Sequence, residues 1–302
     1  MPRVRVSDVH LHVTVAGRGE PLVLLHGFTG SGAQWAPQVA VFAEHFRTVV
    51  VDLLGHGQSD APADPHRYRL ERCVADLAVL LGTLDVQRAC WLGYSMGARV
   101  ALACALAFPE RVAALVLEGV SPGIEDPEER RQRVLHDEAL ADQIERDGVE
   151  AFVDAWMRQP LFASQARLGP EALAAARAAR CANSPVGLAN SLRGMGTGAQ
   201  ESLWPRLAGF TVPTLLAVGQ EDAKFRGVTE NMMRRMGGAT VAIIPASGHA
   251  AHLENPSAFN ACVLGFLQDN TRDRAQVPSA AGSGSPTSTN TSTTNKEEQR
   301  CR

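Results

Sequence analysis

Short apolar segments alternate with helical segments along most of the chain, and this alternation limits the possible folds more than any other feature. The apolar segments lie at 22–26, 48–52, 89–93, 113–118, 214–219 and 240–245. Amphipathic helical patterns, such as those at 70–84 and 256–267, separate them. Residues 9–15 instead alternate polar and apolar side chains, so we expect an antiparallel edge hairpin with residues 4–6. Apolar strands joined by helices predict an α/β fold with a mostly parallel sheet, covered on both faces.

The alternation stops between residues 118 and 213. This interval is rich in Ala, Arg and Glu and has helix-start signals at Asp126-Pro127 and Gly169-Pro170, but it has no convincing strand. We expect a helical insertion over the carboxyl edge of the sheet, where open α/β sheets bind ligands.

The predicted domains are a core at 1–118 and 206–270, a helical cap at 119–205 and a tail at 271–302. From about Pro278 the composition changes to Ser, Thr, Gly, Asn and Pro, with no aromatic or aliphatic side chain after Val277 except Ala. Such a segment cannot bury enough apolar surface to offset its ordering entropy, so we expect a disordered tail.

Composition excludes several classes of function. The chain has 29 Lys and Arg against 32 Asp and Glu, so no overall positive field attracts nucleic acid or anionic lipid. No apolar run approaches the length of a membrane span and no signal peptide is visible, so we expect a cytoplasmic protein. We also expect a monomer. The 6 cysteines form no C-x-x-C pair, so we expect reduced, mostly buried thiols and no zinc site.

A serine stands where a strand-like segment meets an apolar helical one. Gly93-Tyr94-Ser95-Met96-Gly97 places Ser95 on a tight strand-to-helix turn that needs small neighbours on both sides. A serine N-cap in a glycine-flanked turn would explain the same motif. The partners of Ser95 therefore decide between catalysis and capping.

A catalytic serine needs an imidazole to take its proton and a carboxylate to hold that imidazole. His249 follows the last strand-like segment and a flexible Ser-Gly turn, and His252 competes with it. The acid is Asp222 or Glu221, which follow the strand-like segment at 214–219, or Glu118, which ends the segment at 113–118. We prefer His249 and Asp222, because the last strand and helix leave them opposite each other.

Two backbone N–H groups are candidates for stabilising an oxyanion, those of Phe28 and Met96. Gly27 lets the backbone turn sharply after its strand and aim the Phe28 N–H at developing negative charge. His26 and His56 lie in loops without a second ligand at metal spacing, so we interpret them as structural residues.

Arg99 follows the motif's serine by four positions and lies one turn inward on the same helix face. Its neighbours are apolar, so the guanidinium is buried and needs either a protein carboxylate or an anion of the substrate. Lys224 and the cap arginines Arg130, Arg131 and Arg133 favour an anionic substrate, although an exposed helix face explains most cap arginines equally well.

Four segments resemble a known family more specifically than the serine motif does. They are Gly-Tyr-Ser-Met-Gly-Ala-Arg at 93–99, Glu-Gly-Val-Ser-Pro-Gly at 118–123, Trp-Met-Arg-Gln-Pro-Leu-Phe-Ala-Ser at 156–164 and Glu-Asp-Ala-Lys-Phe at 221–225. From about residue 9 to 267 the chain resembles the α/β-hydrolase fold. Within that fold it resembles the 2-succinyl-6-hydroxy-2,4-cyclohexadiene-1-carboxylate synthases of menaquinone biosynthesis.

The resemblance implies an eight-stranded, mostly parallel sheet flanked by helices, with a helical cap. It implies a triad of Ser95, Asp222 and His249 that acts as a general base in a lyase. The reaction removes a proton, expels pyruvate and forms a ring diene, and it uses neither a metal nor an organic cofactor.

The resemblance also implies a small-molecule substrate with several carboxylates. Arg99, Arg133 and Lys224 would hold these, beside Tyr94 and Trp156. Two other functions remain open. A hydrolase of carboxylic esters or carbon–carbon bonds could use the same triad, although a neutral ester would leave Arg99 unpaired. A non-enzymatic binding member of the fold would have no need of a complete triad.

Overall fold

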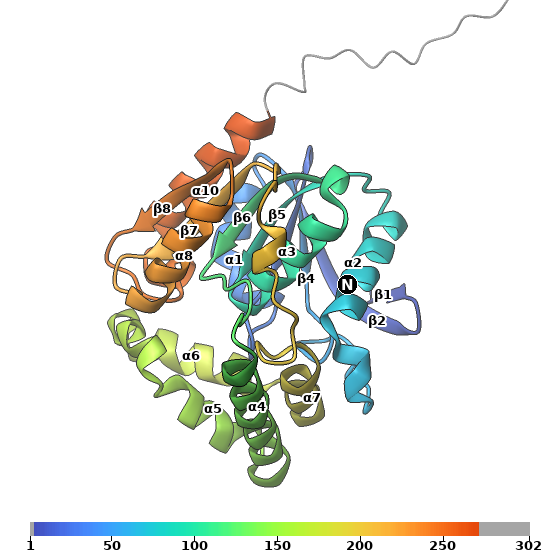
Figure 1. The fold of residues 1–302 in the computed structure, drawn as a ribbon, viewed down its shortest axis with the longest axis vertical. Coiled ribbons are helices and arrows are strands. Elements are labelled where there is room, and N and C mark those ends of the chain that lie inside the picture. Colours follow the sequence, from blue (N-terminus) through green and yellow to red (C-terminus); the bar gives the residue numbers. More distant parts are fainter. Residues whose placement is uncertain (1–2, 272–302) are drawn as a thin grey trace, which may run out of the picture.

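A single sheet runs through the molecule in the strand order β1-β2-β4-β3-β5-β6-β7-β8 (Figure 1). It is seen in a computed structural model that describes residues 3–271. The pairs β1–β2 and β2–β4 are antiparallel and all other neighbours are parallel, which confirms the predicted sheet. The strands are β1 (Arg3–Val6), β2 (Val9–Ala16), β3 (Pro21–Leu25), β4 (Arg47–Val51), β5 (Ala89–Tyr94), β6 (Val112–Glu118), β7 (Thr214–Gly219) and β8 (Ala239–Ile244).

Helices cover both faces of the sheet. The core helices are α1 (Ala36–Phe42), α2 (Leu70–Thr83), α3 (Met96–Ala107), α8 (Ala223–Arg235), α9 (Ala251–Glu254) and α10 (Pro256–Thr271). Leu77 of α2 and Met232 of α8 belong to one apolar cluster, and Phe42 of α1 and Phe259 of α10 belong to the other. Trp91 of β5 points into the first cluster and its neighbours point into the second, because successive strand residues face opposite sides. This burial on both faces explains the apolar strands.

The predicted edge hairpin is present, with Val4 opposite Leu11. The strands predicted at 22–26 and 48–52 each end one residue earlier, because their last residues turn into loops. His26 Nε2 accepts a hydrogen bond from a loop backbone N–H at 3.0 Å, and Asp52 Oδ1 accepts one at 2.6 Å.

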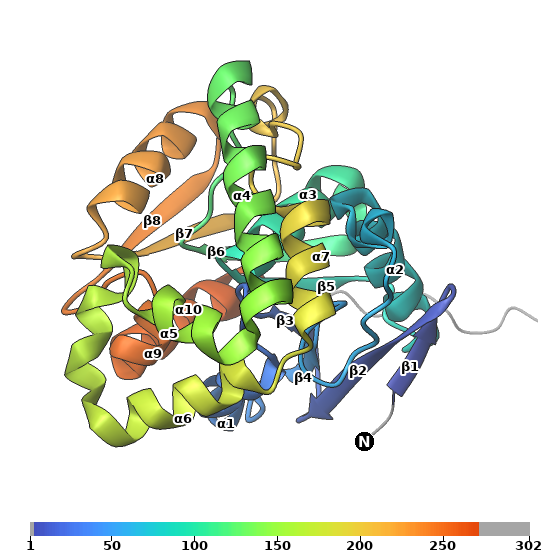
Figure 2. The same cartoon turned by 90° about the horizontal axis from the view of Figure 1, so that it is seen from below.

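Four helices lie over the carboxyl ends of the parallel strands (Figure 2). They are α4 (Pro127–Asp147), α5 (Val149–Met157), α6 (Gly169–Cys181) and α7 (Pro185–Met195). Both helix-start signals are confirmed: the Asp126 carboxylate accepts from two N–H groups of the first turn of α4, and α6 begins at Gly169. The division of the chain into core and cap at residues 119 and 206 stays a prediction.

Thr271 ends α10 and therefore does not belong to the predicted tail, whose other residues lie outside the described part of the chain. Five cysteines are described, all free: Cys73, Cys90 and Cys104 are buried, and Cys181 and Cys262 are partly buried. Cys301 lies outside the described residues. None of the helices within residues 3–271 has the length and apolar character needed to cross a membrane.

Candidate active site

Ser95 joins β5 to α3 in a strained conformation, with φ of 50° and ψ of −106°. A Cβ atom on Gly93 would overlap the carbonyl oxygen of Gly97, and one on Gly97 would overlap that of Leu25. The glycines of the motif are therefore required by close backbone packing. Ser95 stands at the N-cap position of α3, but its side chain makes no capping hydrogen bond.

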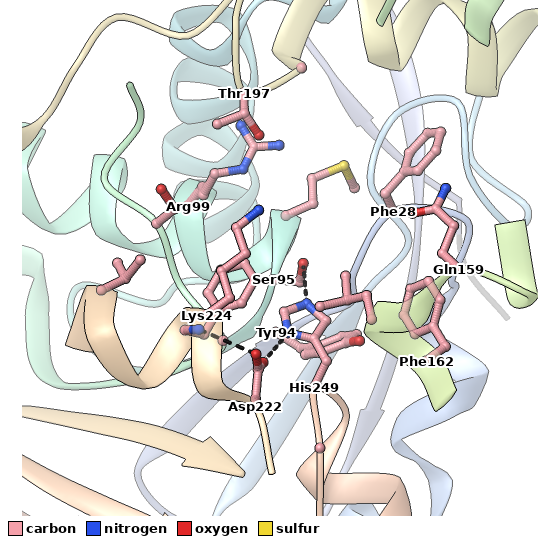
Figure 3. A pocket seen from close by; sticks show the side chains of 18 of the residues that line it. Phe28, Tyr94, Ser95, Arg99, Gln159, Phe162, Thr197, Asp222, Lys224 and His249 are labelled. Atoms are coloured by element: carbon pink, nitrogen blue, oxygen red, sulfur yellow. Dashed lines mark hydrogen bonds and ion pairs between the residues drawn. The ribbon is translucent and has the colours of Figure 1, made fainter. Parts of the chain in front are cut away.

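The side chains of Ser95, His249 and Asp222 lie in one line (Figure 3). His249 Nε2 lies 3.1 Å from Ser95 Oγ, and His249 Nδ1 lies 2.7 Å from Asp222 Oδ2. The other carboxylate oxygen of Asp222 accepts from the Phe225 N–H at 3.2 Å, which fixes its orientation. This is the geometry of a hydroxyl that can pass its proton to an imidazole held by an acid.

The imidazole of His249 is confined on several sides. The Phe225 ring centroid lies 4.4 Å from that of His249, and the Tyr94 centroid lies 5.4 Å away. Gly119 has φ of +57°, and a Cβ atom there would lie 2.8 Å from His249 Cε1. Only glycine fits this position without moving the ring.

The other candidates for the triad, His252, Glu118 and Glu221, form ion pairs away from Ser95. His252 Nδ1 lies 2.8 Å from Glu118 Oε2, and both side chains are almost completely buried. Glu221 instead forms an ion pair with Arg167. These contacts explain why His252, Glu118 and Glu221 do not align with Ser95.

The two predicted oxyanion donors both border the space in front of Ser95. Met96 is the first residue of α3, so its N–H has no carbonyl partner one turn earlier in the helix. Phe28 precedes Thr29, which has φ of 65°, in a turn closed by a 3.0 Å hydrogen bond from Gly30 N to Gly27 O. Their role as donors stays a prediction.

A cavity of about 1210 Å³ lies between the cap helices and the carboxyl edge of the sheet. Its volume slightly exceeds the usual range for small-molecule sites, roughly 300–1,000 Å³. The residues predicted for the site all line it: Phe28, Tyr94, Ser95, Met96, Arg99, Arg133, Trp156, Asp222, Lys224 and His249.

Arg99 is 9% exposed and has no ion pair within residues 3–271. Its Nη1 donates to Gln200 Oε1 at 2.7 Å. Burial, followed by the positive charge of Arg133, lowers the pKa of Arg99 to about 10 against the opposing effect of the nearby Asp137 carboxylate, so the guanidinium is still charged at pH 7. Of the two alternatives left open by the sequence, a protein carboxylate is therefore not the hydrogen-bond partner of Arg99.

The other predicted cations differ in their surroundings. Arg133 Nε lies 2.8 Å from Asp137 Oδ1 and is partly exposed, whereas Lys224 is exposed beside Phe225. Of the cap arginines, Arg133 lines the cavity, but Arg131 pairs with a neighbouring glutamate on the surface.

Arg180 near the end of α6 was missed by the sequence analysis and also lines the cavity. Burial lowers its pKa, and its Nε is buried without a hydrogen-bond partner in the described part of the chain. The alanines around Arg180 in the sequence could have indicated a buried arginine. Arg177, three residues earlier, has the same surroundings but pairs with Asp154, so sequence could not separate the two.

Aromatic rings form one wall of the cavity. Trp156 stacks on Phe152 with ring centroids 5.6 Å apart, and it meets Phe28 edge to face at 5.3 Å. The Trp156 Nε1–H is buried and has no acceptor among residues 3–271. It is therefore a free donor beside the cavity.

The histidines interpreted as structural make loop contacts. His26 uses both ring nitrogens on backbone groups, and burial lowers its pKa. His56 Nδ1 lies 3.1 Å from a backbone carbonyl, and burial lowers its pKa to about 3. Within the described residues, no three His, Cys, Asp or Glu side chains gather as a metal site would require.

Comparison with known proteins agrees with this architecture. Residues 20–256 match the model of the family described as "alpha/beta hydrolase fold". The chain belongs to the α/β-hydrolase fold family. Within it, the chain is 44% identical to a Bacillus subtilis (strain 168) protein named "Putative 2-succinyl-6-hydroxy-2,4-cyclohexadiene-1-carboxylate synthase", over 87% of this chain and 97% of that protein.

Two further proteins are similar to this chain over most of its length. The 2-succinyl-6-hydroxy-2,4-cyclohexadiene-1-carboxylate synthase of Serratia proteamaculans (strain 568) is 31% identical, over 82% of this chain and 92% of that enzyme. The structure of MenH from S. aureus superimposes with a TM-score of 0.82 at 32% identity, over 87% of this chain and 99% of that one.

Proposed function

We propose that this enzyme is a carbon–oxygen lyase of menaquinone biosynthesis. It eliminates pyruvate from a cyclohexene that carries several carboxylates and so forms 2-succinyl-6-hydroxy-2,4-cyclohexadiene-1-carboxylate. The synthases to which the chain is 44% and 31% identical support this assignment. We also propose a small-molecule substrate and a monomer that works in the cytoplasm; the absence of an excess of positive charge argues against a nucleic-acid substrate.

One observation about the cavity carries the proposal. The Ser95–His249–Asp222 triad shares the cavity with Arg99, a buried cation that has no carboxylate partner in the described part of the chain. A buried, unpaired guanidinium is costly unless a ligand compensates it. A neutral ester would not do so, whereas a substrate with several carboxylates would.

The triad supplies the base. Ser95 Oγ takes a proton from the ring carbon while its own proton passes to His249 Nε2, and Asp222 stabilises the resulting imidazolium. The electrons of the broken C–H bond form the second ring double bond as the C–O bond breaks. The oxygen leaves with the pyruvate unit, which takes up the proton and becomes pyruvate.

The rest of the cavity stabilises negative charge. The N–H groups of Phe28 and Met96 would donate hydrogen bonds to the carbonyl oxygen next to the abstracted proton and so stabilise the negative charge that develops there. Arg99, Arg133 and Lys224 would hold the substrate carboxylates, with Arg180 as a fourth cation. Tyr94 and Trp156 would pack against the ring.

The first test measures pyruvate release by the purified protein with the proposed cyclohexene substrate. Ser95→Ala and His249→Ala should lower kcat by several orders of magnitude without changing the melting temperature, because triad members act as one unit. Equal rates in wild type and Ser95→Ala would contradict the proposed base.

A second test separates elimination from hydrolysis. A hydrolase with this triad forms a covalent acyl-serine, whereas elimination forms no bond to Ser95. Rapid quenching during turnover, followed by intact-protein mass spectrometry, should show no adduct, and deuterium at the abstracted position should slow the reaction. An adduct on Ser95 that forms and decays as fast as turnover would favour the hydrolase.

A further inference from the structure

Arg99 is held by a neutral side chain. Gln200 follows α7, is 1% exposed, and accepts a hydrogen bond from Arg99 Nη1 at 2.7 Å. Its own backbone N–H is fixed to Gly196 O at 3.1 Å. Gln200 Nε2 is buried without a hydrogen-bond partner among residues 3–271. The amide therefore orients the guanidinium without neutralising it.

Two other arginines with little-exposed side chains, Arg67 and Arg193, are paired with carboxylates. Arg67 binds Asp76 through both terminal nitrogens, at 2.7 and 2.9 Å. Arg193 contacts three cap carboxylates at 2.6 to 2.8 Å: those of Glu138, Asp142 and Glu145. A glutamate has nearly the same shape as a glutamine, so the same backbone at position 200 could have given Arg99 a charged partner too.

We propose that Gln200 is a specificity-determining residue, which holds Arg99 in place while leaving its positive charge free for a carboxylate of the substrate. The inference rests on the proposed function, because it takes the ligand of Arg99 to be a carboxylate. It adds a residue that does not itself line the cavity and acts through Arg99. An acidic residue at this position would occupy the guanidinium and compete with the substrate.

The pairing of Arg99 with a neutral glutamine lowers the stability of the fold but favours binding of a carboxylate. An unpaired buried charge and an unpaired buried amide group each destabilise the fold. The substrate carboxylate would supply the missing negative charge, so the cost is recovered when it binds. Preorganised sites commonly accept such a loss of stability.

Gln200→Glu tests the inference in two ways. The new carboxylate should pair with Arg99, so the melting temperature should rise. KM for the carboxylated substrate should increase at least about tenfold with a smaller change in kcat, since substrate binding loses a charged contact. Gln165→Glu is the matched control, because Gln165 is 3% exposed and no arginine donates a hydrogen bond to it in the described structure. This control should melt at a lower temperature.

Gln200→Met separates the effect of a new negative charge beside Arg99 from the effect of losing the hydrogen bond to it. Methionine removes the hydrogen bond but leaves Arg99 uncompensated, so its KM should stay at least several-fold below that of Gln200→Glu. Equal KM values in the two variants, or a lower melting temperature for Gln200→Glu, would overturn the inference. If wild type releases no pyruvate, the proposed function fails, but the melting temperatures still decide whether the charge of Arg99 is uncompensated.

Discussion

At the scale of single residues, the candidate site depends on backbone conformations that ordinary side chains do not favour. Ser95 has φ of 50° and ψ of −106°, a sparsely populated conformation that costs on the order of 1–3 kcal/mol and presents its hydroxyl at the start of α3. Gly119, with φ of +57°, leaves the space that the His249 ring occupies. The alignment of the triad thus depends on the backbone conformations of Ser95 and Gly119.

Gly119→Ala should lower kcat roughly 100-fold, because its methyl group displaces the His249 ring and small misplacements of a catalytic group have effects of this size. Gly209→Ala is the control: Gly209 has φ of +78° but no neighbour within 4 Å of an added Cβ atom. It should lose similar stability from backbone strain while keeping its activity. Steady-state kinetics and thermal melts of both variants check this, and equal activity losses would contradict it.

The sequence predicted these site residues unevenly. Ser95, His249 and Asp222 were found because each follows a strand that its apolar side chains reveal. Their alignment is now seen, while their roles stay predictions. Arg180 and Gln200 were missed because they belong to the cap, where helices and loops meet the cavity at angles that no local pattern specifies. Only three-dimensional packing separates Arg180 from Arg177.

At the scale of elements, the cap is fastened to the core near the predicted oxyanion donors. Asn183, between α6 and α7, is 5% exposed and uses its whole amide. Its Nδ2 donates to Thr29 O at 2.8 Å and to Arg180 O at 3.0 Å, and its Oδ1 accepts from Gly57 N at 2.8 Å. One side chain therefore joins the turn that holds Phe28 to the backbone of Arg180.

Asn183→Asp should both lower kcat and raise KM, because it removes the donations to Thr29 and Arg180 and places a negative charge beside their carbonyl groups. Asn190→Asp is a matched control on α7, since Asn190 Nδ2 donates to the carbonyls of Pro62 and Ala63 rather than to the turn that holds Phe28. The rate at which a fluorophosphonate labels Ser95 gives a readout that needs no substrate. Equal labelling rates in the two variants would show that Asn183 only docks the cap.

At the scale of the whole molecule, the sheet was predictable and the cap geometry was not. Strands buried on both faces need continuous apolar segments, so β3 to β7 stand out in the sequence and were located to within one or two residues. The edge strand β8 was located equally well from its apolar residues, although Val241 and Ile243 are exposed. The cap helices were expected from composition and start signals. Their placement depends on close contacts such as Gly187 against Gly55, which no periodic pattern encodes.

The stability of the whole molecule should depend on pH through histidines buried beneath the cap. Burial lowers the pKa of His56 to about 3 and also lowers that of His26, whereas an unfolded histidine titrates near pH 6.5. Between these values the unfolded chain binds protons that the folded protein does not. Stability is therefore lost as the pH falls below about 6.5, by roughly 1.4 kcal/mol per pH unit for His56 alone.

Urea unfolding between pH 8 and pH 5 measures this dependence. The free energy of unfolding should change little from these histidines above pH 7 and should fall below pH 6.5. His56→Gln removes one titrating group. Between pH 6 and pH 5 the slope of its unfolding free energy against pH should therefore be smaller than that of wild type by about 1.4 kcal/mol per pH unit. Wild type and variant should run parallel above pH 7, where neither state binds the proton. Parallel curves over the whole range would mean that His56 is not held neutral by burial.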